Sequence, residues 1–235
     1  MPINQLIIKQ LETIDYQFTQ RDFELSYWHT KNNSEALTGG RGASQKITIQ
    51  RQFYVLRHYL RGGLIARFLR DQYLWTGLKN SRPYQEQQVT QHAFQKLLPV
   101  PEVVAFCVQK NGLFYRASII SRFINNSGTL AGWLFDSTLA DQQWFELGGV
   151  IKRLHQADIF HADLNANNIL IDDNGQFSII DFDKAKIVSP LGTAADNNIQ
   201  RLLRSLKKIQ TSRHKQGLAF NFSLTQWQQL IEGYR

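Results

Sequence analysis

The residues with the clearest chemical pattern form the polar segment H-A-D-L-N-A-N-N, which runs from His161 to Asn168. An apolar run follows, then a turn signal at 172–175 and a second apolar run that ends before Asp181. Because the turn folds the second run back along the first, Asn168 and Asp181 are predicted to lie at the same end of one hairpin. An amide oxygen beside a carboxylate makes a hard, oxygen-rich site that suits Mg²⁺.

Asp163 stands in the loop that leads into this end of the hairpin, so it can lie near the metal without binding it. A carboxylate beside a metal-bound phosphate is suited to orient a hydroxyl nucleophile and to take its proton. The alternative interpretation is an acidic, Asn-rich surface loop. The H-x-D-x-x-x-x-N spacing, the D-x-x-G turn and the D-F-x step occur together and in order, which favours the catalytic interpretation.

Hydrophobic periodicity predicts the elements that position these residues. Strands are expected over 45–60, 102–109, 114–123, 169–171 and 177–180, and helices over 3–14, 64–76, 82–97, 141–158, 196–210 and 224–232. The first half is therefore strand-rich, and the second half is mostly helical with one hairpin.

The net charge of +8 is concentrated in the first half of the chain. Between residues 41 and 82 many Lys and Arg side chains stand against a single acidic residue, Asp71. Such a block indicates a polyanionic partner, which can be a nucleic acid, an anionic membrane or a phosphorylated substrate. A solvated basic face is the simpler alternative. The candidates for contact with an acceptor are Arg61, Arg67, Arg70 and Arg82.

The chain has one cysteine, Cys107, which excludes an internal disulfide and a zinc cluster and indicates a reducing compartment. No apolar run is long enough to span a membrane, and the N-terminus lacks the pattern of a signal peptide. We therefore expect a cytoplasmic location.

The segment from His161 to Asp181 resembles the catalytic segment of the protein-kinase fold. The resemblance implies that Asp163 is the catalytic base, that Asn168 and Asp181 hold the metal, and that His161 is a scaffold. Ala162 and Asp183 depart from the pattern of regulated protein kinases, and no Ala-Pro-Glu follows. These departures indicate a small-lobed atypical kinase with an acceptor other than a protein.

The first half offers matching residues for a nucleotide. Gly39, Gly40 and Gly42 precede the first strand pair, where a kinase needs a glycine loop over the ATP phosphates. Arg57 stands where the third strand of a kinase carries lysine, and it can bind two phosphate oxygens. Glu86, in the following helical stretch, is its natural partner. An ordinary turn, a surface arginine and a solvent-facing carboxylate are the respective alternatives.

Several motifs together resemble the 3-deoxy-D-manno-octulosonic acid (Kdo) kinases of Gram-negative bacteria. They are G-G-R-G-A from Gly39, V-L-R-H-Y-L-R-G-G-L from Val55, D-x-Y-L-W-T-G-L from Asp71, L-P-V-P from Leu98, H-A-D-L-N-A-N-N-I-L and D-F-D-K. The resemblance covers about 39–209 and implies transfer of the ATP γ-phosphoryl group to the 4-hydroxyl of Kdo on lipid A precursor. It also implies a peripheral enzyme at the cytoplasmic face of the inner membrane, which agrees with the basic block.

The expected fold is α+β, bilobal and protein-kinase-like. Residues 1–38 would form an N-terminal extension, 39–123 a strand-rich N-lobe and 124–235 a small, mostly helical C-lobe. The expected cofactors are ATP and Mg²⁺, and the expected partners are an anionic glycolipid acceptor and an anionic membrane surface. Neither a nucleic acid nor an obligate protein partner is expected.

Three alternatives remain for function. An aminoglycoside-type phosphotransferase shares the H-x-D-x-x-x-x-N loop, but those enzymes favour acidic pockets. An atypical protein kinase of the RIO type is a second option. A kinase-fold module that binds membranes without catalysis is the third, and intact Asp163, Asn168 and Asp181 argue against it.

Overall fold

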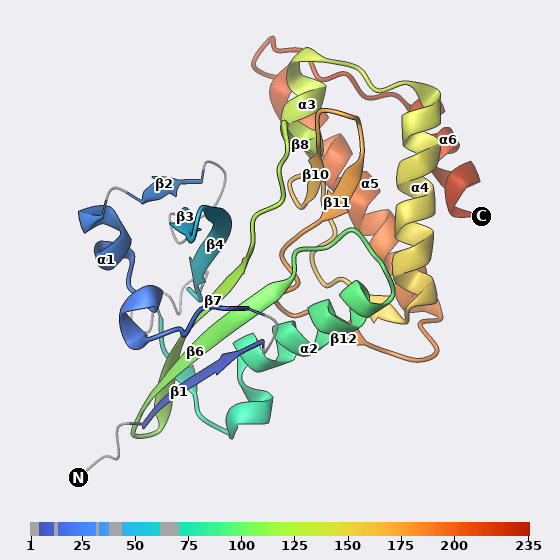
Figure 1. The fold of residues 1–235 in the computed structure, drawn as a ribbon. Helices are drawn as coiled ribbons and strands as arrows, with labels where there is room; N and C mark the ends of the chain where they lie inside the picture. Colours follow the sequence, from blue (N-terminus) through green and yellow to red (C-terminus); the bar gives the residue numbers. More distant parts are fainter. Residues whose placement is uncertain (1–4, 12–13, 32, 38–43, 62–70) are drawn as a thin grey trace. The chain divides into compact units, whose positions relative to one another are not determined.

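The computed structural model describes residues 5–11, 14–31, 33–37, 44–61 and 71–235. The chain divides into two compact units (Figure 1). Unit 1 consists of Met1–Gln88 and Glu102–Phe123, and unit 2 consists of Val89–Pro101 and Ile124–Arg235.

Unit 1 is built on an antiparallel sheet with the strand order β1-β6-β7-β4-β3-β2, and the short strand β5 also pairs with β7 (Figure 1). The strands are β1 (Gln5–Gln10), β2 (Ser34–Ala36), β3 (Ser44–Ile49), β4 (Gln52–His58), β5 (Tyr73–Leu74), β6 (Val103–Asn111) and β7 (Phe114–Arg122). The helical elements are η1 (Gln20–Phe23), α1 (Leu25–Thr30), η3 (Leu78–Asn80) and α2 (Arg82–Gln95), which ends in unit 2.

Strands β6 and β7 form the centre of unit 1 because both faces of the sheet are covered there. Phe106 and Tyr115 belong to one apolar cluster, whereas Cys107 and Ile120 belong to a second one with Trp28. Alternation of side chains along a strand places neighbours on opposite faces. Burial raises the pKa of the Cys107 thiol to about 12, so this thiol is an inert core residue.

The expected helix 3–14 is wrong, and so is the described end of the expected helix 64–76. Residues of the expected helix 3–14 form strand β1 instead, with Ile7 opposite Val108 and Ile8 opposite Cys107 on β6. A short isolated helix is only marginally stable in water, whereas pairing with the edge of the sheet stabilises this segment as a strand. The apolar pattern of six residues fits either structure. In the expected helix 64–76, Tyr73–Leu74 form β5, and residues 62–70 lie outside the described residues.

Unit 2 combines helices with three short pairs of strands. Its helices are α3 (Leu130–Asp136), α4 (Asp141–Gln156), α5 (Thr193–His214) and α6 (Leu224–Tyr234). Its strands are β8 (Gly128–Thr129), β9 (Ile159–Phe160), β10 (Ile169–Ile171), β11 (Phe177–Ile179) and β12 (Lys186–Ile187). The predicted helices at 141–158, 196–210 and 224–232 and the predicted hairpin are therefore confirmed, whereas α3 was not anticipated.

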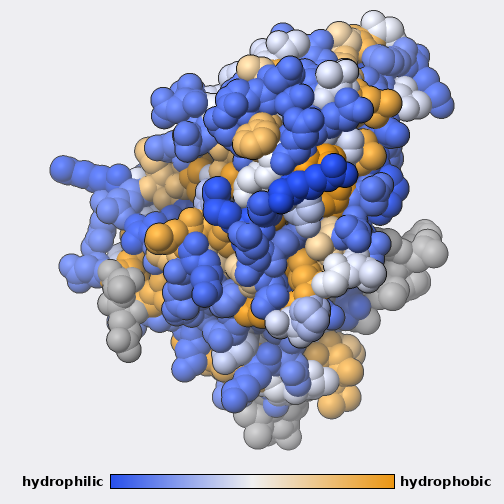
Figure 2. All heavy atoms as spheres, turned by 90° about the vertical axis from the view of Figure 1, so that its right-hand side faces the viewer, coloured by the Kyte–Doolittle hydropathy of each residue, from blue (hydrophilic) through white to orange (hydrophobic). Residues whose placement is uncertain are grey.

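The core of unit 2 lies between the helices and the hairpin. Trp144, Leu147 and Ile151 on α4 are fully buried, and so are Leu202 and Leu206 on α5. Figure 2 looks onto the side that carries α4 and α6 and shows mostly hydrophilic side chains there. Among the helices of the described residues, none combines the length and the apolar character needed to cross a membrane.

Candidate active site

The hairpin of β10 and β11 brings two polar residues to one end. Ile169 pairs with Ile179, and the amide of Ile180 donates a hydrogen bond of 3.0 Å to the carbonyl of Asn168. Asp181 follows at once, so the predicted proximity of Asn168 and Asp181 along the backbone is confirmed. Asp181 has a φ of 64°, a left-handed conformation that is uncommon for a residue other than glycine and that recurs at functional sites.

Asp163 lies in the loop before this hairpin, and its backbone carbonyl is held by hydrogen bonds from other residues of the same segment. The side-chain amides of Asn165 and Asn168 donate hydrogen bonds of 3.0 and 2.9 Å to the carbonyl of Asp163. Its carboxylate is 58% exposed. The loop is thus held by its backbone while the carboxylate faces solvent, which is what a base that meets an incoming hydroxyl requires.

His161 is completely buried and supports the loop. Its Nε2 donates to the carbonyl of Ile180 at 3.0 Å, and its Nδ1 accepts from the amide of Asp163 at 3.3 Å. The ring of Phe182 packs edge-on against it. Burial lowers the pKa of His161, so the ring is neutral, and both nitrogens serve the backbone. His161 is therefore placed as a scaffold.

Helix α5 holds the same loop through residues that the sequence analysis missed. Asn198, completely buried, accepts from the amide of His161 at 3.0 Å and donates to its carbonyl at 2.8 Å. Ser205 accepts from the amide of Ala166 at 3.0 Å. The available signal was a pair of polar residues within the apolar stripe of a predicted helix, since a buried polar group needs a partner.

Unit 1 contains the ion pair expected between Arg57 and Glu86. Nη2 of Arg57 donates to both carboxylate oxygens of Glu86 at 2.5 Å, and the Tyr59 hydroxyl donates to Oε2 at 2.6 Å. Glu86 is 7% exposed and Arg57 is 22% exposed. The pair joins strand β4 to helix α2, and Tyr59 is a further member that sequence reasoning did not identify.

The predicted glycine loop cannot be placed. Gly39, Gly40 and Gly42 lie outside the described residues. The strands on either side of them, β2 and β3, pair with each other, and Ser44 at the start of β3 lies opposite Arg57 on β4. Arg57 therefore lies beside the first described residue after the glycine segment.

Two of the four candidates for contact with an acceptor make contacts within unit 1. Nε of Arg61 donates to the carbonyl of Gln72 at 2.6 Å, and its guanidinium lies 4.7 Å from the ring centre of Tyr73. Arg82 donates to the Tyr73 hydroxyl at 2.8 Å. Their charges are thus used in part to build the unit. The other two candidates, Arg67 and Arg70, lie outside the described residues.

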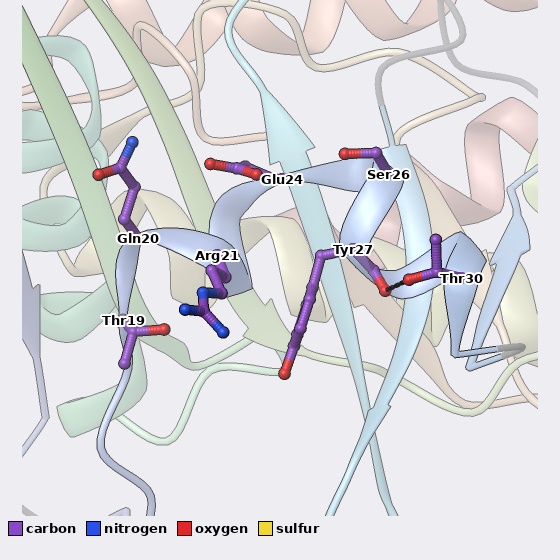
Figure 3. Close-up of a pocket in the computed structure, with 7 residues that line it drawn as sticks. All are labelled: Thr19, Gln20, Arg21, Glu24, Ser26, Tyr27 and Thr30. Carbon is purple, nitrogen blue, oxygen red and sulfur yellow. Dashed lines mark hydrogen bonds between the residues drawn. The ribbon is translucent and has the colours of Figure 1, made fainter.

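The described residues of unit 1 form pockets at two places, and the predicted site residues that the structure describes line neither of them. One, of about 560 Å³, is formed by residues of η1 and α1 and their flanks, namely Thr19, Gln20, Arg21, Glu24, Ser26, Tyr27 and Thr30 (Figure 3). The other, of about 270 Å³, includes His58, Asp71, Cys107, Arg116 and Ser118. The predicted site is therefore identified by the positions of its side chains and not by either of these pockets.

The donor set at the hairpin fits a hard cation. Asn168 and Asp181 offer amide and carboxylate oxygens at one backbone location. No group of three or more His, Cys, Asp or Glu side chains able to hold a metal occurs in the described parts of the chain. Mg²⁺ commonly uses one or two carboxylates and takes its other ligands from substrate phosphates and water. Two protein ligands are therefore sufficient.

Phosphoryl transfer to an alcohol needs little covalent chemistry from a protein. It needs a carboxylate to position the hydroxyl, oxygen ligands for a cation and fixed positive charge for phosphates. Groups of all three kinds occur in the described parts of the chain, and this set of groups is typical of a phosphotransferase with an alcohol group as acceptor.

The model of the lipopolysaccharide kinase (Kdo/WaaP) family matches residues 27–234, and the chain belongs to this family. A 3-deoxy-D-manno-octulosonic acid kinase of Stenotrophomonas maltophilia (strain K279a) is 40% identical over 194 residues, which cover 81% of this chain and 76% of that protein. The kinase of the same name from Mannheimia succiniciproducens is 36% identical over 221 residues, covering 91% and 89%. That of Photobacterium damsela subsp. piscicida is 36% identical over 206 residues, covering 87% and 84%.

Proposed function

We propose that this chain transfers the γ-phosphoryl group of ATP to the 4-hydroxyl of Kdo on Kdo-lipid A precursor. The observation that carries the proposal is the exposed carboxylate of Asp163 in a loop whose backbone carbonyl accepts a hydrogen bond from Asn168, at the end of the hairpin that leads into Asp181. The names of the relatives supply the substrate class.

Within this proposal Asp163 orients the acceptor hydroxyl and takes its proton as the oxygen attacks the γ-phosphorus of ATP, and the bond to the β-phosphate oxygen breaks to release ADP. The neutral ring of His161 keeps the backbone of Asp163 in place and does not compete for the proton. Asn168 and Asp181 would hold Mg²⁺, which when bound neutralises charge on the phosphates of ATP.

Residues of unit 1 would bind the nucleotide. Arg57, held by Glu86, offers a permanent charge for phosphate oxygens. Gly39, Gly40 and Gly42 would allow the backbone to approach the phosphates. We accordingly assign nucleotide binding to the lobe 39–123 and catalysis to the lobe 124–235, with 1–38 as an extension of the first lobe.

The acceptor is an anionic glycolipid, so the enzyme would work at the cytoplasmic face of the inner membrane of a Gram-negative bacterium. The net charge of +8 and its concentration in the first half favour an anionic surface. Attraction of this kind acts over about 8 Å at physiological ionic strength, so binding would weaken as salt is raised.

The direct test is phosphate transfer from [γ-³²P]ATP to Kdo-lipid A precursor, followed by analysis of the phosphorylated position. We expect labelled lipid with phosphate on the 4-hydroxyl, and no label when Mg²⁺ is removed by a chelator. An aminoglycoside and a casein-like protein are the comparison acceptors. Transfer to either of these with none to the glycolipid would contradict the proposal.

A further inference from the structure

One face of helix α5 presents three polar side chains to the loop from His161 to Asn168, which we call the catalytic loop. Asn198 and Ser205 each bind the backbone of this loop, as described above. Arg201 lies between them in sequence, three residues after one and four residues before the other. Residues at this spacing share a face of a helix. The two backbone contacts thereby fix the place from which the Arg201 side chain extends.

Arg201 approaches the carboxylate that we assign as the base. Its Nη1 lies 3.5 Å from Oδ1 of Asp163, and the two side chains are 46% and 58% exposed. An ion pair this open contributes little to the stability of a fold. The arrangement nevertheless puts a permanent cation next to the carboxylate that we assign as the base, and both side chains are accessible to solvent.

We propose that Arg201 binds the carboxylate of a sugar-acid acceptor and so determines acceptor specificity. The inference rests on the proposed function and names the group of the acceptor that the site recognises. In Kdo the carboxylate is carried by C2 and the reacting hydroxyl by C4, with only the C3 methylene between these carbons. A carboxylate and a hydroxyl so close together match a guanidinium and a carboxylate 3.5 Å apart.

Arginine suits this role because its planar guanidinium binds a carboxylate through two parallel hydrogen bonds. One charged contact would then attract the acid group of the sugar while Asp163 takes the neighbouring hydroxyl. A neutral sugar would leave the guanidinium without a counterpart in the acceptor. The substrate class is therefore anionic sugars with an acid group two carbons from the reacting alcohol.

The experiment compares two acceptors, Kdo-lipid A precursor in detergent and the same lipid with the Kdo carboxylate converted to its methyl ester. Wild-type enzyme should prefer the acid about 10- to 100-fold in kcat/KM, the range expected for a hydrogen bond between charged groups. Arg201→Gln should lose about the same factor with the acid, mainly in KM, and change little with the ester. Arg201→Lys should recover part of the preference.

The matched control is Arg204→Gln, one turn further along α5 and also exposed. It should keep the wild-type preference, and the KM for ATP should stay unchanged in every variant. Thermal unfolding checks that Arg201→Gln is folded.

Equal use of both acceptors by the wild type would overturn the assignment of Arg201 while leaving the proposed function intact. An equal loss on both acceptors in Arg201→Gln would also overturn it, because Arg201 would then act only by orienting Asp163. The same loss of preference for the acid in Arg204→Gln would also overturn the assignment, because the preference would then depend only on the net charge of the protein. Absence of transfer to either acceptor by the wild type would instead contradict the proposed function, and the inference would fall with it.

Discussion

The hydroxyl of Tyr59 and the guanidinium of Arg57 donate to the same carboxylate, that of Glu86, at 2.6 and 2.5 Å. Arg57 lies on strand β4 opposite Ser44 of β3, whereas Glu86 comes from helix α2. The guanidinium also lies 4.8 Å from the centre of the Tyr59 ring. The position of the Arg57 charge therefore depends on Glu86 and on Tyr59 together.

Glu86→Gln should raise the KM for ATP about tenfold or more, because Arg57 loses its charged hydrogen-bond partner. The melting temperature should fall as well, since the variant leaves a partly buried cation without its counter-ion. Glu102→Gln is the matched control, because Glu102 pairs with Arg122 in the same unit. An equal rise of the KM for ATP in both variants would show that only sheet stability matters.

Asp163→Ala should lower kcat by about 10² to 10⁴, the usual contribution of a positioned general base. The melting temperature should barely change, because the carboxylate is 58% exposed. Asp173→Ala, an exposed residue in the turn at the opposite end of the hairpin, is the control and should keep near-normal turnover. Turnover of Asp163→Ala within about threefold of the wild type would remove this residue from the mechanism.

Asn168→Ala and Asp181→Ala should both raise the concentration of Mg²⁺ needed for half-maximal activity, since each removes an oxygen ligand. Asp181→Ala should have the larger effect because it also removes a negative charge. A titration of activity with Mg²⁺ at saturating ATP measures the shift. An unchanged Mg²⁺ requirement in both variants would mean that the hairpin end holds no metal.

The stability of the protein should fall as the pH is lowered through about 6.5, the ordinary pKa of histidine. Burial lowers the pKa of His58, His155 and His161. These rings therefore stay neutral in the native state at pH values at which the same histidines are protonated in the unfolded chain. The unfolded chain then binds more protons, and the free energy of unfolding decreases. Urea titrations at pH 7.5 and 5.0 measure the difference.

His155→Gln should reduce this dependence of stability on pH. It should also lower the stability at pH 7.5, because His155 forms hydrogen bonds with the side chains of Tyr234 and Asn198. His214→Gln, at the exposed end of α5, should leave the dependence as in the wild type. If the wild type is more stable at pH 5.0 than at pH 7.5, the interpretation of the buried histidines is wrong.

Gly148→Ala should destabilise unit 2 by about 2 kcal/mol or more, because the added methyl group has no space. A Cβ there would overlap the carbonyl of Leu230 and lie 2.7 Å from the amide of Tyr234, both on α6. Gly149→Ala meets no atom within 4 Å and should stabilise α4 by about 1 kcal/mol. Urea unfolding compares the two variants, and equal effects would show that α4 and α6 are not closely packed in solution.

The placement of Asn168 and Asp181 at one end of a hairpin could be predicted from the sequence because this geometry is local. A turn between two short apolar runs leaves few ways to place Asn168 relative to Asp181, and the register of Ile169 with Ile179 bears this out. The helices α4, α5 and α6 were predictable for a similar reason, since their apolar stripes repeat over several turns. The charge and position of Glu86 made it the expected partner of Arg57, and the ion pair is present.

Contacts between distant segments were decided only by the tertiary structure. Strand β1 exists because β6 offers it an edge, which no pattern within residues 5–10 contains. Asn198 lies 37 residues from His161 and reaches it only because α5 packs against the loop. The proximity of Arg201 to Asp163 arises in the same way. The sequence alone therefore determines the residues of the local hairpin site. The packing of helix α5 against the loop determines which polar and charged side chains lie beside them, because these contacts join segments that are far apart in the chain.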